Sequence, residues 1–391
     1  MTITTMTTIE RRKTSKARRS NGGVPDGPLP ALCGYGKLSV PVTSGSDPLL
    51  GSNGLILSLQ TPADSERARA VAVIGAAPRL SLACHITPDG DALGSMMALH
   101  HLARAYGRDV VSSWPDPFVV ASTYRSLPGL DQCVPASDFP PTPEVMVTFD
   151  CAALGRLAEL ASPASWAAKH SELVVVDHHV TNDRFGTVNV IDARAAATAV
   201  VVRSIARDLG WELNRDAATC LYVGLVADTG RFQYSSTTSS VFALAEELAS
   251  FDLPIAALSR QLFSEHRFAY LQLASVALAR AELDSDLRFV HTAVLLEDQR
   301  TYDVTYDEVE GLIEWVRSTA EAEVACVLKE TEDGFRVSLR SIDAVDVGSI
   351  AHALGGGGHR LAAGFTMRMP LEEAVRIVKQ HVAEAIAARQ E

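Results

Sequence analysis

The sequence comprises 391 residues, of which 47% are hydrophobic and 21% are charged. This composition is that of an ordinary globular protein with a full apolar core, and the length predicts two or three domains. The net charge of −12 argues against a general binder of long duplex nucleic acid, because such proteins carry a basic footprint. Short, multiply charged anions remain compatible with it, since a local basic pocket can lie within an acidic chain.

The first 60 residues are rich in Thr, Ser, Gly and Pro and show no sustained periodicity, which predicts a disordered N-terminal extension over 1–60. The first 20 residues carry a net charge of +5, which leaves −17 for the remainder. No apolar stretch follows this basic run, so we do not interpret it as a secretory signal. No apolar run of 18 residues occurs, which predicts that the protein does not span a membrane.

The six cysteines form no Cys-x-x-Cys pair, which argues against a disulfide framework or a zinc finger and favours a reducing, cytoplasmic location. We expect Cys84 and Cys151 to be small buried side chains rather than metal ligands.

Strands and helices alternate from residue 61 onward. A helix is expected from about 61 to 76, followed by short apolar strands at 80–84, 145–149 and 173–176. Helical patterns at 92–106 and 195–209 end at Gly107 and Gly210. The alternation predicts an α/β domain with a largely parallel sheet.

The second half of the chain is expected to begin with a buried helix at 217–227, followed by helical stretches over about 240–284. Strand patterns then appear at 289–296, 324–329 and 335–340, with a helix around 306–319, a Gly-rich turn at 355–358 and a helix from about 371. The predicted domains are therefore 61–240, a helical linker over 241–285, and a smaller α/β domain over 286–391.

Polar residues follow each predicted strand of the first domain. His85, Asp89 and Asp91 follow the first strand, Asp150 follows the second, Asp177-His178-His179 follow the third, and Asp228 follows the buried helix. Parallel strands bring their carboxyl ends, and the ligands bound there, to one edge of the sheet. A single Asp-Gly-Asp turn or a lone buried His is usually structural, but burying Asp177-His178-His179 costs several kcal/mol unless these residues have partners. Four such clusters, each at the end of an element, together favour a functional site.

Clustered carboxylates repel one another unless cations lie between them. A set of Asp and His without a thiolate suits Mn²⁺ or a similar ion better than Ca²⁺ or structural zinc. The number of ligands suits two ions that share a carboxylate, an arrangement that activates water for phosphoryl displacement.

The segment from Gly355 to Arg360 contains four glycines followed by His and Arg. Consecutive glycines let backbone N–H groups approach a phosphate, and an Arg supplies a bidentate donor, so we favour an anion site over a flexible linker. Arg340 and Ser341 lie at the end of a predicted strand and are a weaker indication of the same anion site. The alternative is that Arg340 is simply an exposed charge at the edge of the sheet.

The candidate ligands resemble the motifs of the DHH phosphoesterase superfamily. The residues that carry the resemblance are Asp177-His178-His179, His85-x-x-x-Asp89-x-Asp91, Asp150 and Asp228. The segment from Gly355 to Gly364 resembles its DHHA1 domain. The resemblance spans about 65–390 and implies a parallel-sheet DHH domain plus a smaller α/β DHHA1 domain, with an active site in the cleft between them. Asp228-Thr-Gly-Arg-Phe232 and the Gly-rich run further resemble the NrnA type, a bifunctional oligoribonuclease and 3′-phosphoadenosine 5′-phosphate (PAP) phosphatase.

The resemblance implies a role for each candidate residue. His85, Asp89 and Asp150 would hold one Mn²⁺, and Asp91, Asp150, His178 and Asp228 the other, with Mg²⁺ or Co²⁺ as alternatives and Asp150 as the bridge. Asp177 would orient an imidazole or water, and His179 would contact the scissile phosphate or help the leaving oxygen. The substrate would be held by Arg340, Ser341, Gly356, Gly357, Gly358, His359 and Arg360.

The expected partners are short RNA oligonucleotides and small nucleotides, with no long duplex and no membrane, and a homodimer is compatible with the resemblance. The expected reaction is hydrolysis of these oligonucleotides to 5′-mononucleotides and of PAP to AMP. A cyclic di-AMP or linear dinucleotide phosphodiesterase is one alternative, and a catalytically silent nucleotide-binding regulator is another. An exonuclease of the RecJ kind would need an oligonucleotide-binding domain for which there is no room, and a family II pyrophosphatase would lack the Gly-rich run.

Overall fold

The computed structural model describes residues 62–388. The predicted extension over 1–60, including its basic run, lies outside the described residues. No helix within residues 62–388 is long and apolar enough to cross a membrane. All five cysteines in this range are free, and both Cys84 and Cys151 are buried as expected.

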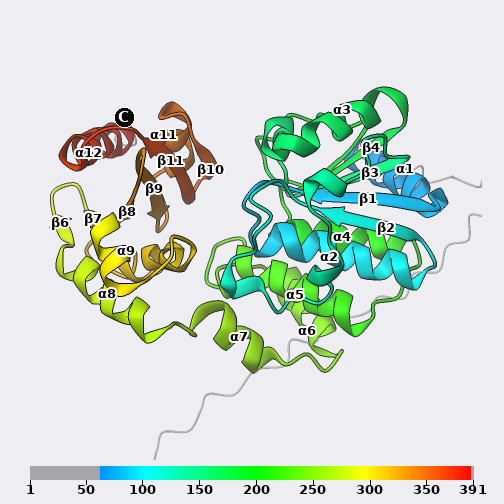
Figure 1. Ribbon diagram of the computed structural model, residues 1–391, viewed down its shortest axis with the longest axis horizontal. Coiled ribbons are helices and arrows are strands. Elements are labelled where there is room, and N and C mark those ends of the chain that lie inside the picture. Colours follow the sequence, from blue (N-terminus) through cyan, green and yellow to red (C-terminus); the bar gives the residue numbers. More distant parts are fainter. Residues whose placement is uncertain (1–61, 389–391) are drawn as a thin grey trace, which may run out of the picture. The chain divides into compact units, whose positions relative to one another are not determined.

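A five-stranded parallel sheet forms the centre of the first α/β region (Figure 1). Its strands are β1 (Arg79–Cys84), β2 (Asp109–Ser113), β3 (Val145–Phe149), β4 (Glu172–Asp177) and β5 (Val188–Ile191), in the order β2-β1-β3-β4-β5. The predicted parallel sheet is confirmed. The sequence did not reveal the outer strands β2 and β5, because both are short and carry polar residues that interrupt the apolar pattern.

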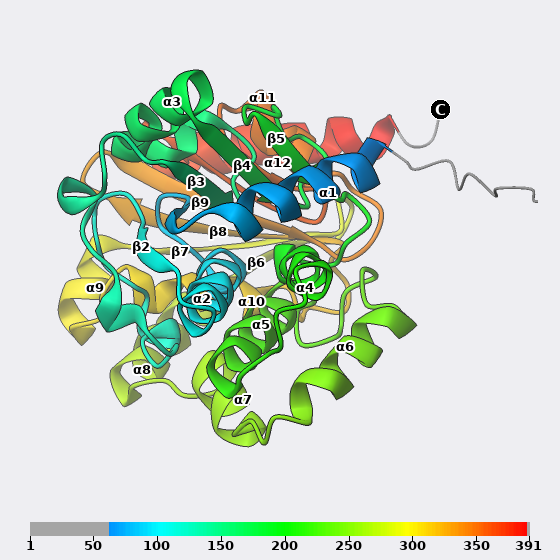
Figure 2. The same ribbon diagram turned by 90° about the vertical axis from the view of Figure 1, so that its right-hand side faces the viewer.

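Helices cover both faces of this sheet, because successive side chains of a buried strand point to opposite faces. Leu82 and Val147 lie in a core with α1 (Pro62–Ala76), α2 (Gly90–Ala105), α4 (Thr198–Asp208) and α5 (Arg215–Asp228). Ala83 and Met146, one residue along each strand, face α3 (Ala161–His170) and the 3₁₀ segment η4 (Leu154–Leu160) on the other side. Figures 1 and 2 show α3 on one side of the sheet and α2, α4 and α5 on the other.

The strand order reverses direction between β1 and β3, since the chain runs outward from β1 to β2 and then returns to β3. In open α/β sheets such a switch point leaves a crevice at the carboxyl ends of the strands, where ligands bind. Cys84 pairs with Phe149, and Phe149 pairs with Val176, so the three strands end in register. The residues that follow each strand therefore emerge side by side.

Close packing of α2 on α5 brings two of these polar clusters together. A Cβ atom at Gly90 would lie 2.8 Å from Ala227 Cβ, and one at Gly94 would lie 2.4 Å from the Cys220 carbonyl oxygen. Only glycine permits this approach, which places the start of α2 against the end of α5.

Gly94→Ala is expected to lower the free energy of unfolding by about 1–3 kcal/mol, because overpacking against a backbone carbonyl outweighs the better helix propensity of Ala. Chemical denaturation of the full-length protein measures this loss. Gly155→Ala is the matched control, since a Cβ atom there meets nothing within 4 Å. Equal stabilities of the two variants would contradict the packing argument.

Three short 3₁₀ turns lie between β2 and β3. They are η1 (Ser122–Tyr124), η2 (Leu130–Gln132) and η3 (Ala136–Asp138).

Three helices follow α5: α6 (Ser239–Ala249), α7 (Ile255–Phe263) and α8 (Phe268–Ala279). Leu248 of α6 and Leu258 of α7 pack in the first core, whereas Leu273 of α8 packs beneath a second sheet. The segment predicted as a linker is thus helical and contributes to both cores. The exact domain limits at 240 and 286 stay predictions.

The second sheet has six strands in the order β10-β11-β9-β8-β7-β6. They are β6 (Glu282–Asp284), β7 (Phe289–Val294), β8 (Val324–Thr331), β9 (Gly334–Ser341), β10 (Gly357–His359) and β11 (Ala362–Met367). Only the β7–β8 pair is parallel among these described strands. Helices lie on both faces of this sheet. The core on one face includes α11 (Val347–Ala353) and α12 (Leu371–Ala387). The core on the other face includes α8, α10 (Leu312–Val316) and η5 (Asp307–Gly311).

Several predicted elements of this region need correction. The strand expected over 289–296 stops at Val294, and its last residues begin α9 (Leu296–Tyr302). The single helix expected at 306–319 is split into η5 and α10. The Gly-rich segment is only partly a turn, because Gly357 and Gly358 pair with β11 as a short strand.

Candidate metal centre

The polar residues predicted to follow the strands do lie together. His85, Asp150 and Asp177 stand at the carboxyl ends of β1, β3 and β4, and Asp228 is the last residue of α5. His85, Asp91, Asp150 and Asp177 are all buried. Four groups of three potential ligands have ligand atoms within 4.8 Å of one another, and three of these groups contain Asp150.

The first of these groups consists of His85, Asp89 and Asp150. Nε2 of His85 lies 3.6 Å from Oδ2 of Asp150 and 4.0 Å from Oδ2 of Asp89. The Asp89 side chain is the N-cap of α2: its Oδ1 accepts the N–H groups of Asp91 and Ala92, so Oδ2 is left to face the imidazole. The group therefore presents one nitrogen and two carboxylate oxygens to a common point.

The tautomer of His85 depends on Nδ1, which lies 2.8 Å from the Ile86 carbonyl oxygen and 2.9 Å from Nη2 of Arg156. A protonated Nδ1 donates to Ile86, whereas an unprotonated one accepts from Arg156. The first state leaves the lone pair of Nε2 directed at the carboxylates, which is the state a metal ligand requires.

The second group consists of Asp91, Asp150 and His178, with Asp228 alongside. Nε2 of His178 lies 3.1 Å from Asp228 Oδ2, 3.6 Å from Asp150 Oδ1 and 4.0 Å from Asp91 Oδ2. Nδ1 lies 3.1 Å from the Ala195 carbonyl oxygen, so a proton on Nδ1 leaves Nε2 with a free lone pair.

The buried Nε2 of His178 makes no hydrogen bond within residues 62–388, because its approach to Asp228 lacks hydrogen-bond geometry. A buried imidazole nitrogen without a partner, surrounded by three carboxylates, fits a metal ligand.

Asp150 joins the two groups. Its Oδ2 faces His85, while its Oδ1 faces His178 and accepts a hydrogen bond of 2.9 Å from the hydroxyl of Thr198. The backbone of Asp150 adopts a left-handed conformation with φ of 53°. Strained backbone of this kind persists where the surrounding structure enforces it, and it is concentrated at functional sites.

The buried carboxylate of Asp91 is fixed by the start of α4. The N–H groups of Thr198 and Ala199 donate to its two oxygens, and the hydroxyl of Ser95 donates to Oδ1. Sequence reasoning missed Thr198 and Ser95. The only available signal was the helix expected from residue 195, whose free N-terminal N–H groups can bind an anion.

Asp177, the last residue of β4, contacts protein donors with both of its oxygens. Oδ1 accepts from the N–H groups of His178 and His179 and from Nδ1 of His179, and Oδ2 accepts from the side chain of Asn182. Asp177 therefore orients the loop rather than offering a free oxygen. The His179 ring stacks on that of His359, with centroids 4.3 Å apart.

The crowding of charges shifts several pKa values. Burial raises the pKa of Asp91 well above its usual range, and Asp228 and Asp150 raise it further. Burial likewise raises the pKa of Asp228 to about 6, although His178 opposes this. Burial alone would also raise the pKa of Asp150, but the three surrounding imidazoles lower it. The carboxylates thus repel one another and are partly neutralised by protons, which is the condition that a divalent cation relieves.

Metal affinity is expected to rise with pH, because protons occupy the imidazoles of the metal-free protein. Burial favours neutral His178, yet Asp228, Asp91 and Asp150 raise its pKa to about 11, and Asp150 and Asp89 likewise raise the pKa of His85 against the effect of burial. A raised pKa favours the protonated imidazole, so the cation must displace that proton, and affinity gains up to about tenfold per pH unit for each proton displaced.

Calorimetric titration of the metal-stripped protein at pH 6.5 and 7.5, in buffers of different ionisation heat, measures both the affinity and the protons released. An affinity that is independent of pH, with no proton release, would contradict this assignment.

The residues predicted to bind substrate are partly engaged within the protein. Arg340 donates from Nε to Glu314 at 3.2 Å, and Arg360 donates to the carbonyl oxygens of Asp343 and Ala344 at 3.1 Å each. The hydroxyl of Ser341 is buried and makes no hydrogen bond within the described residues.

The backbone of the Gly-rich segment is also partly engaged. The Gly356 N–H donates to the Ala351 carbonyl oxygen at 2.8 Å and thereby caps α11, so it is not free for a phosphate. Gly358, with φ of 141°, and His359 belong to β10. Among the predicted substrate residues, His359 is the one that contacts the metal-centre histidines, through the rings of His178 and His179.

Two family models match the chain. Residues 80–225 match the DHH family, N-terminal domain, and residues 288–388 match the DHHA1 domain. These two segments contain all of the candidate metal ligands and predicted substrate residues except Asp228.

Similar proteins support the same assignment. The bifunctional oligoribonuclease and PAP phosphatase NrnA of Thermus thermophilus is 31% identical over 306 residues, which cover 78% of this chain and 89% of that protein. The protein of the same name from Bacillus subtilis is 25% identical over 75% of this chain and 90% of its own length. An exopolyphosphatase-related protein from Bacteroides fragilis shares the fold, with a TM-score of 0.77 at 22% identity over 84% of this chain and 98% of that one. The chain therefore belongs to the DHH/DHHA1 phosphoesterase superfamily, with relatives of the NrnA type, and is a phosphoric ester hydrolase.

Proposed function

We propose that this protein is a Mn²⁺-dependent phosphoesterase that hydrolyses short oligoribonucleotides to 5′-mononucleotides and PAP to AMP. The observation that carries the proposal is the pair of ligand groups that share Asp150 at the switch point of the sheet. The names of the NrnA relatives supply the substrate classes. Mg²⁺ and Co²⁺ are alternatives to Mn²⁺ for the same ligands.

In this proposal His85, Asp89 and Asp150 hold one ion, and Asp91, Asp150, His178 and Asp228 hold the other. Two bound divalent ions would lower the pKa of a water molecule and neutralise charge on the phosphate. The protein itself fixes the ligands: Thr198 orients Asp150, the start of α4 orients Asp91, and the Ala195 carbonyl group selects the tautomer of His178.

His179 is the proposed proton donor to the leaving oxygen. Its Nδ1 lies 2.7 Å from Asp177 Oδ1, so the second ring nitrogen, Nε2, is the atom that can donate outward. Burial lowers the pKa of His179, but Asp177 and Asp150 raise it above the ordinary value, which favours the protonated ring. Asp177 thus acts as a positioning residue for the imidazole.

The residues proposed to hold the substrate are Arg340, Ser341, Gly357, Gly358, His359 and Arg360. Gly356 is left out, because its N–H donates to the Ala351 carbonyl oxygen. Because Arg340 is paired with Glu314, the phosphate of a substrate must compete with that carboxylate. Such competition favours ligands with a full phosphate charge over neutral ones.

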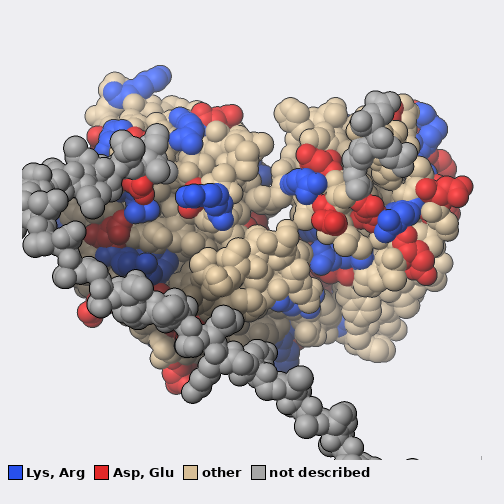
Figure 3. Space-filling view, turned by 180° about the vertical axis from the view of Figure 1, so that it is seen from behind, with Lys and Arg blue, Asp and Glu red and all other residues tan. Residues whose placement is uncertain are grey.

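The charge distribution suits short substrates. On the face shown in Figure 3, basic and acidic side chains form small mixed groups rather than a continuous basic band. A long duplex needs such a band, whereas a short nucleotide needs only a local pocket. The free thiols of Cys84, Cys133, Cys151, Cys220 and Cys326 are consistent with a reducing compartment, and we include the cytoplasm in the proposal.

A direct comparison of substrates tests the proposal. The purified full-length protein with Mn²⁺ is incubated with PAP, a labelled five-nucleotide RNA and cyclic di-AMP, and kcat/KM is measured for each. We expect turnover of PAP and RNA and its loss on addition of EDTA. Turnover of cyclic di-AMP alone would reassign the substrate, and binding of all three without turnover would identify a silent regulator.

A further inference from the structure

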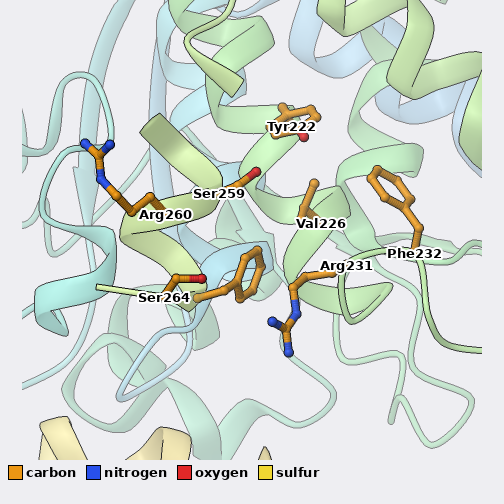
Figure 4. A pocket seen from close by; sticks show the side chains of 8 residues that line it. Tyr222, Val226, Arg231, Phe232, Ser259, Arg260 and Ser264 are labelled. Carbon is orange, nitrogen blue, oxygen red and sulfur yellow. The ribbon is translucent and has the colours of Figure 1, made fainter. Parts of the chain in front are cut away.

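A second candidate site lies at the carboxyl end of α5, the helix that ends at Asp228, on residues that have no role in the proposed reaction. A cavity of about 510 Å³ opens between α5, α7 and the loop that follows Asp228 (Figure 4). This volume lies within the range of about 300–1,000 Å³ that is common for ligand pockets. The lining residues are Tyr222, Val226, Arg231, Phe232, Ser259, Arg260, Phe263 and Ser264.

Arg231 provides an uncommitted positive charge in this cavity. Its guanidinium lies 4.9 Å from the ring centroid of Phe263, and within residues 62–388 no carboxylate or carbonyl oxygen accepts a hydrogen bond from it. By contrast, Arg260 pairs with Glu265 at 3.3 Å, and Arg340 pairs with Glu314. A guanidinium whose donors have no acceptor among the described residues, in a protein of net charge −12, is suited to a phosphate.

The other walls suit the remaining parts of a nucleotide. Tyr222, Val226, Phe232 and Phe263 offer aromatic and aliphatic surface, and Ser259 and Ser264 offer hydroxyl groups. Nucleobases stack on aromatic side chains without regard to sequence, and hydroxyl groups hydrogen-bond sugars. The arginine, the aromatic rings and the hydroxyl groups therefore match the phosphate, the base and the ribose of one nucleotide, respectively.

The loop that carries Arg231 is strained and begins at a candidate metal ligand. Gly230, Arg231 and Phe232 have φ values of 54°, 62° and 62°, directly after Asp228 and Thr229. Three successive residues in the left-handed region persist only where packing enforces them. The Phe232 ring stacks on that of Phe242, with centroids 5.5 Å apart, and the Arg231 guanidinium lies over the Phe263 ring. These two contacts keep the loop in its left-handed conformation.

We propose that this cavity binds a nucleoside monophosphate unit, with its phosphate on Arg231 and its base against Phe263. The unit is either a free mononucleotide product or the next nucleotide of a bound strand, since both have the same chemistry. A ligand there would contact the loop that directly follows Asp228 and would thereby be linked to the metal centre. The binding claim rests on the cavity and does not require the proposed hydrolysis.

The first test measures binding of AMP to the full-length, metal-stripped protein by calorimetry. We expect Arg231→Gln and Phe263→Ala each to weaken binding at this site by about tenfold or more, since each removes one of the two main contacts. Arg231→Lys should retain part of the affinity, because it keeps the charge. Arg207→Gln is the charge control, since Arg207 is exposed on α4 and does not line the cavity.

Thermal unfolding of each variant verifies that the fold is retained, and Phe263→Ala keeps the test valid if Arg231→Gln disturbs the strained loop. AMP affinities of Arg231→Gln and Phe263→Ala within twofold of the unaltered protein would overturn the proposal, as would the absence of AMP binding. Because the protein carries no metal in this assay, its outcome is independent of whether PAP or RNA is hydrolysed.

Two kinetic measurements then identify the source of the nucleotide. A free product is indicated if AMP inhibits the unaltered enzyme and Phe263→Ala relieves that inhibition. A strand nucleotide is indicated if Phe263→Ala raises KM for a five-nucleotide RNA but not for a dinucleotide. Unchanged inhibition together with unchanged KM values would count against a functional site.

Discussion

Asp150→Asn is expected to lower kcat/KM by about a thousandfold or more, with the fold retained. Asp150 is the one carboxylate that faces both ligand groups, since Oδ2 lies 3.6 Å from His85 and Oδ1 lies 3.6 Å from His178. An amide keeps the size of the side chain and its hydrogen bond from Thr198 but loses the negative charge. Steady-state kinetics and metal analysis by mass spectrometry of the purified variant measure both consequences.

Asp109→Asn is the matched control, because Asp109 is an exposed residue at the start of β2, at the opposite end of the strand from the candidate site. This variant should retain the activity and the metal content of the unaltered protein. Turnover by Asp150→Asn at the original rate with a full complement of metal would rule out the shared-carboxylate mechanism.

Asp91→Ala is expected to have the largest effect on folding, with a loss of about 3–5 kcal/mol in the free energy of unfolding. The side chain of Asp91 is fully buried and accepts hydrogen bonds from Thr198, Ala199 and Ser95, so its removal leaves three donors without a partner and opens a void. Urea denaturation in the presence of EDTA measures the loss without a contribution from bound metal.

Ser95→Ala removes one of the three donors and leaves the carboxylate in place, so it should cost only about 1 kcal/mol. Asp91→Asn should fall between the two variants, because an amide retains one acceptor oxygen. A loss of less than 1 kcal/mol for Asp91→Ala would show that the start of α4 does not depend on this carboxylate.

The candidate ligands could be found from the sequence because each lies where a recognisable element ends. His85, Asp150 and Asp177 follow three apolar strands whose residues fit a buried parallel sheet, and the register Cys84–Phe149–Val176 brings their side chains to the same edge. Local pattern and global fold agree here, so the position in sequence was a sufficient guide.

The supporting contacts could not be found in this way, because they depend on elements far apart in the chain. Nothing near Thr198 in the sequence indicates that its hydroxyl reaches Asp150 or that its N–H reaches Asp91, 107 residues away. The pairing of Arg340 with Glu314 likewise depends on how α10 lies on the second sheet.

The second sheet was predicted less completely than the first for a related reason. Strand β10 is Gly-Gly-His and β11 begins with Ala-Ala-Gly, residues that do not mark a strand, and β6 has only three residues. The short helix α11 precedes the glycines and ends where Gly356 caps it. Pairing with β9, a tertiary interaction, makes β11 a strand despite its weak propensity.

The hydrogen bonds from α4 to Asp91 also bear on how the protein acquires its metal. The partial positive charge of a helix N-terminus offsets a carboxylate, and the start of α2 does the same for Asp89. Two of the clustered acids are thus held in place by peptide dipoles, so their assembly does not wait for a cation. We therefore expect the metal-free protein to keep its fold, so that the supply of metal would set the fraction of active molecules rather than the amount of folded protein.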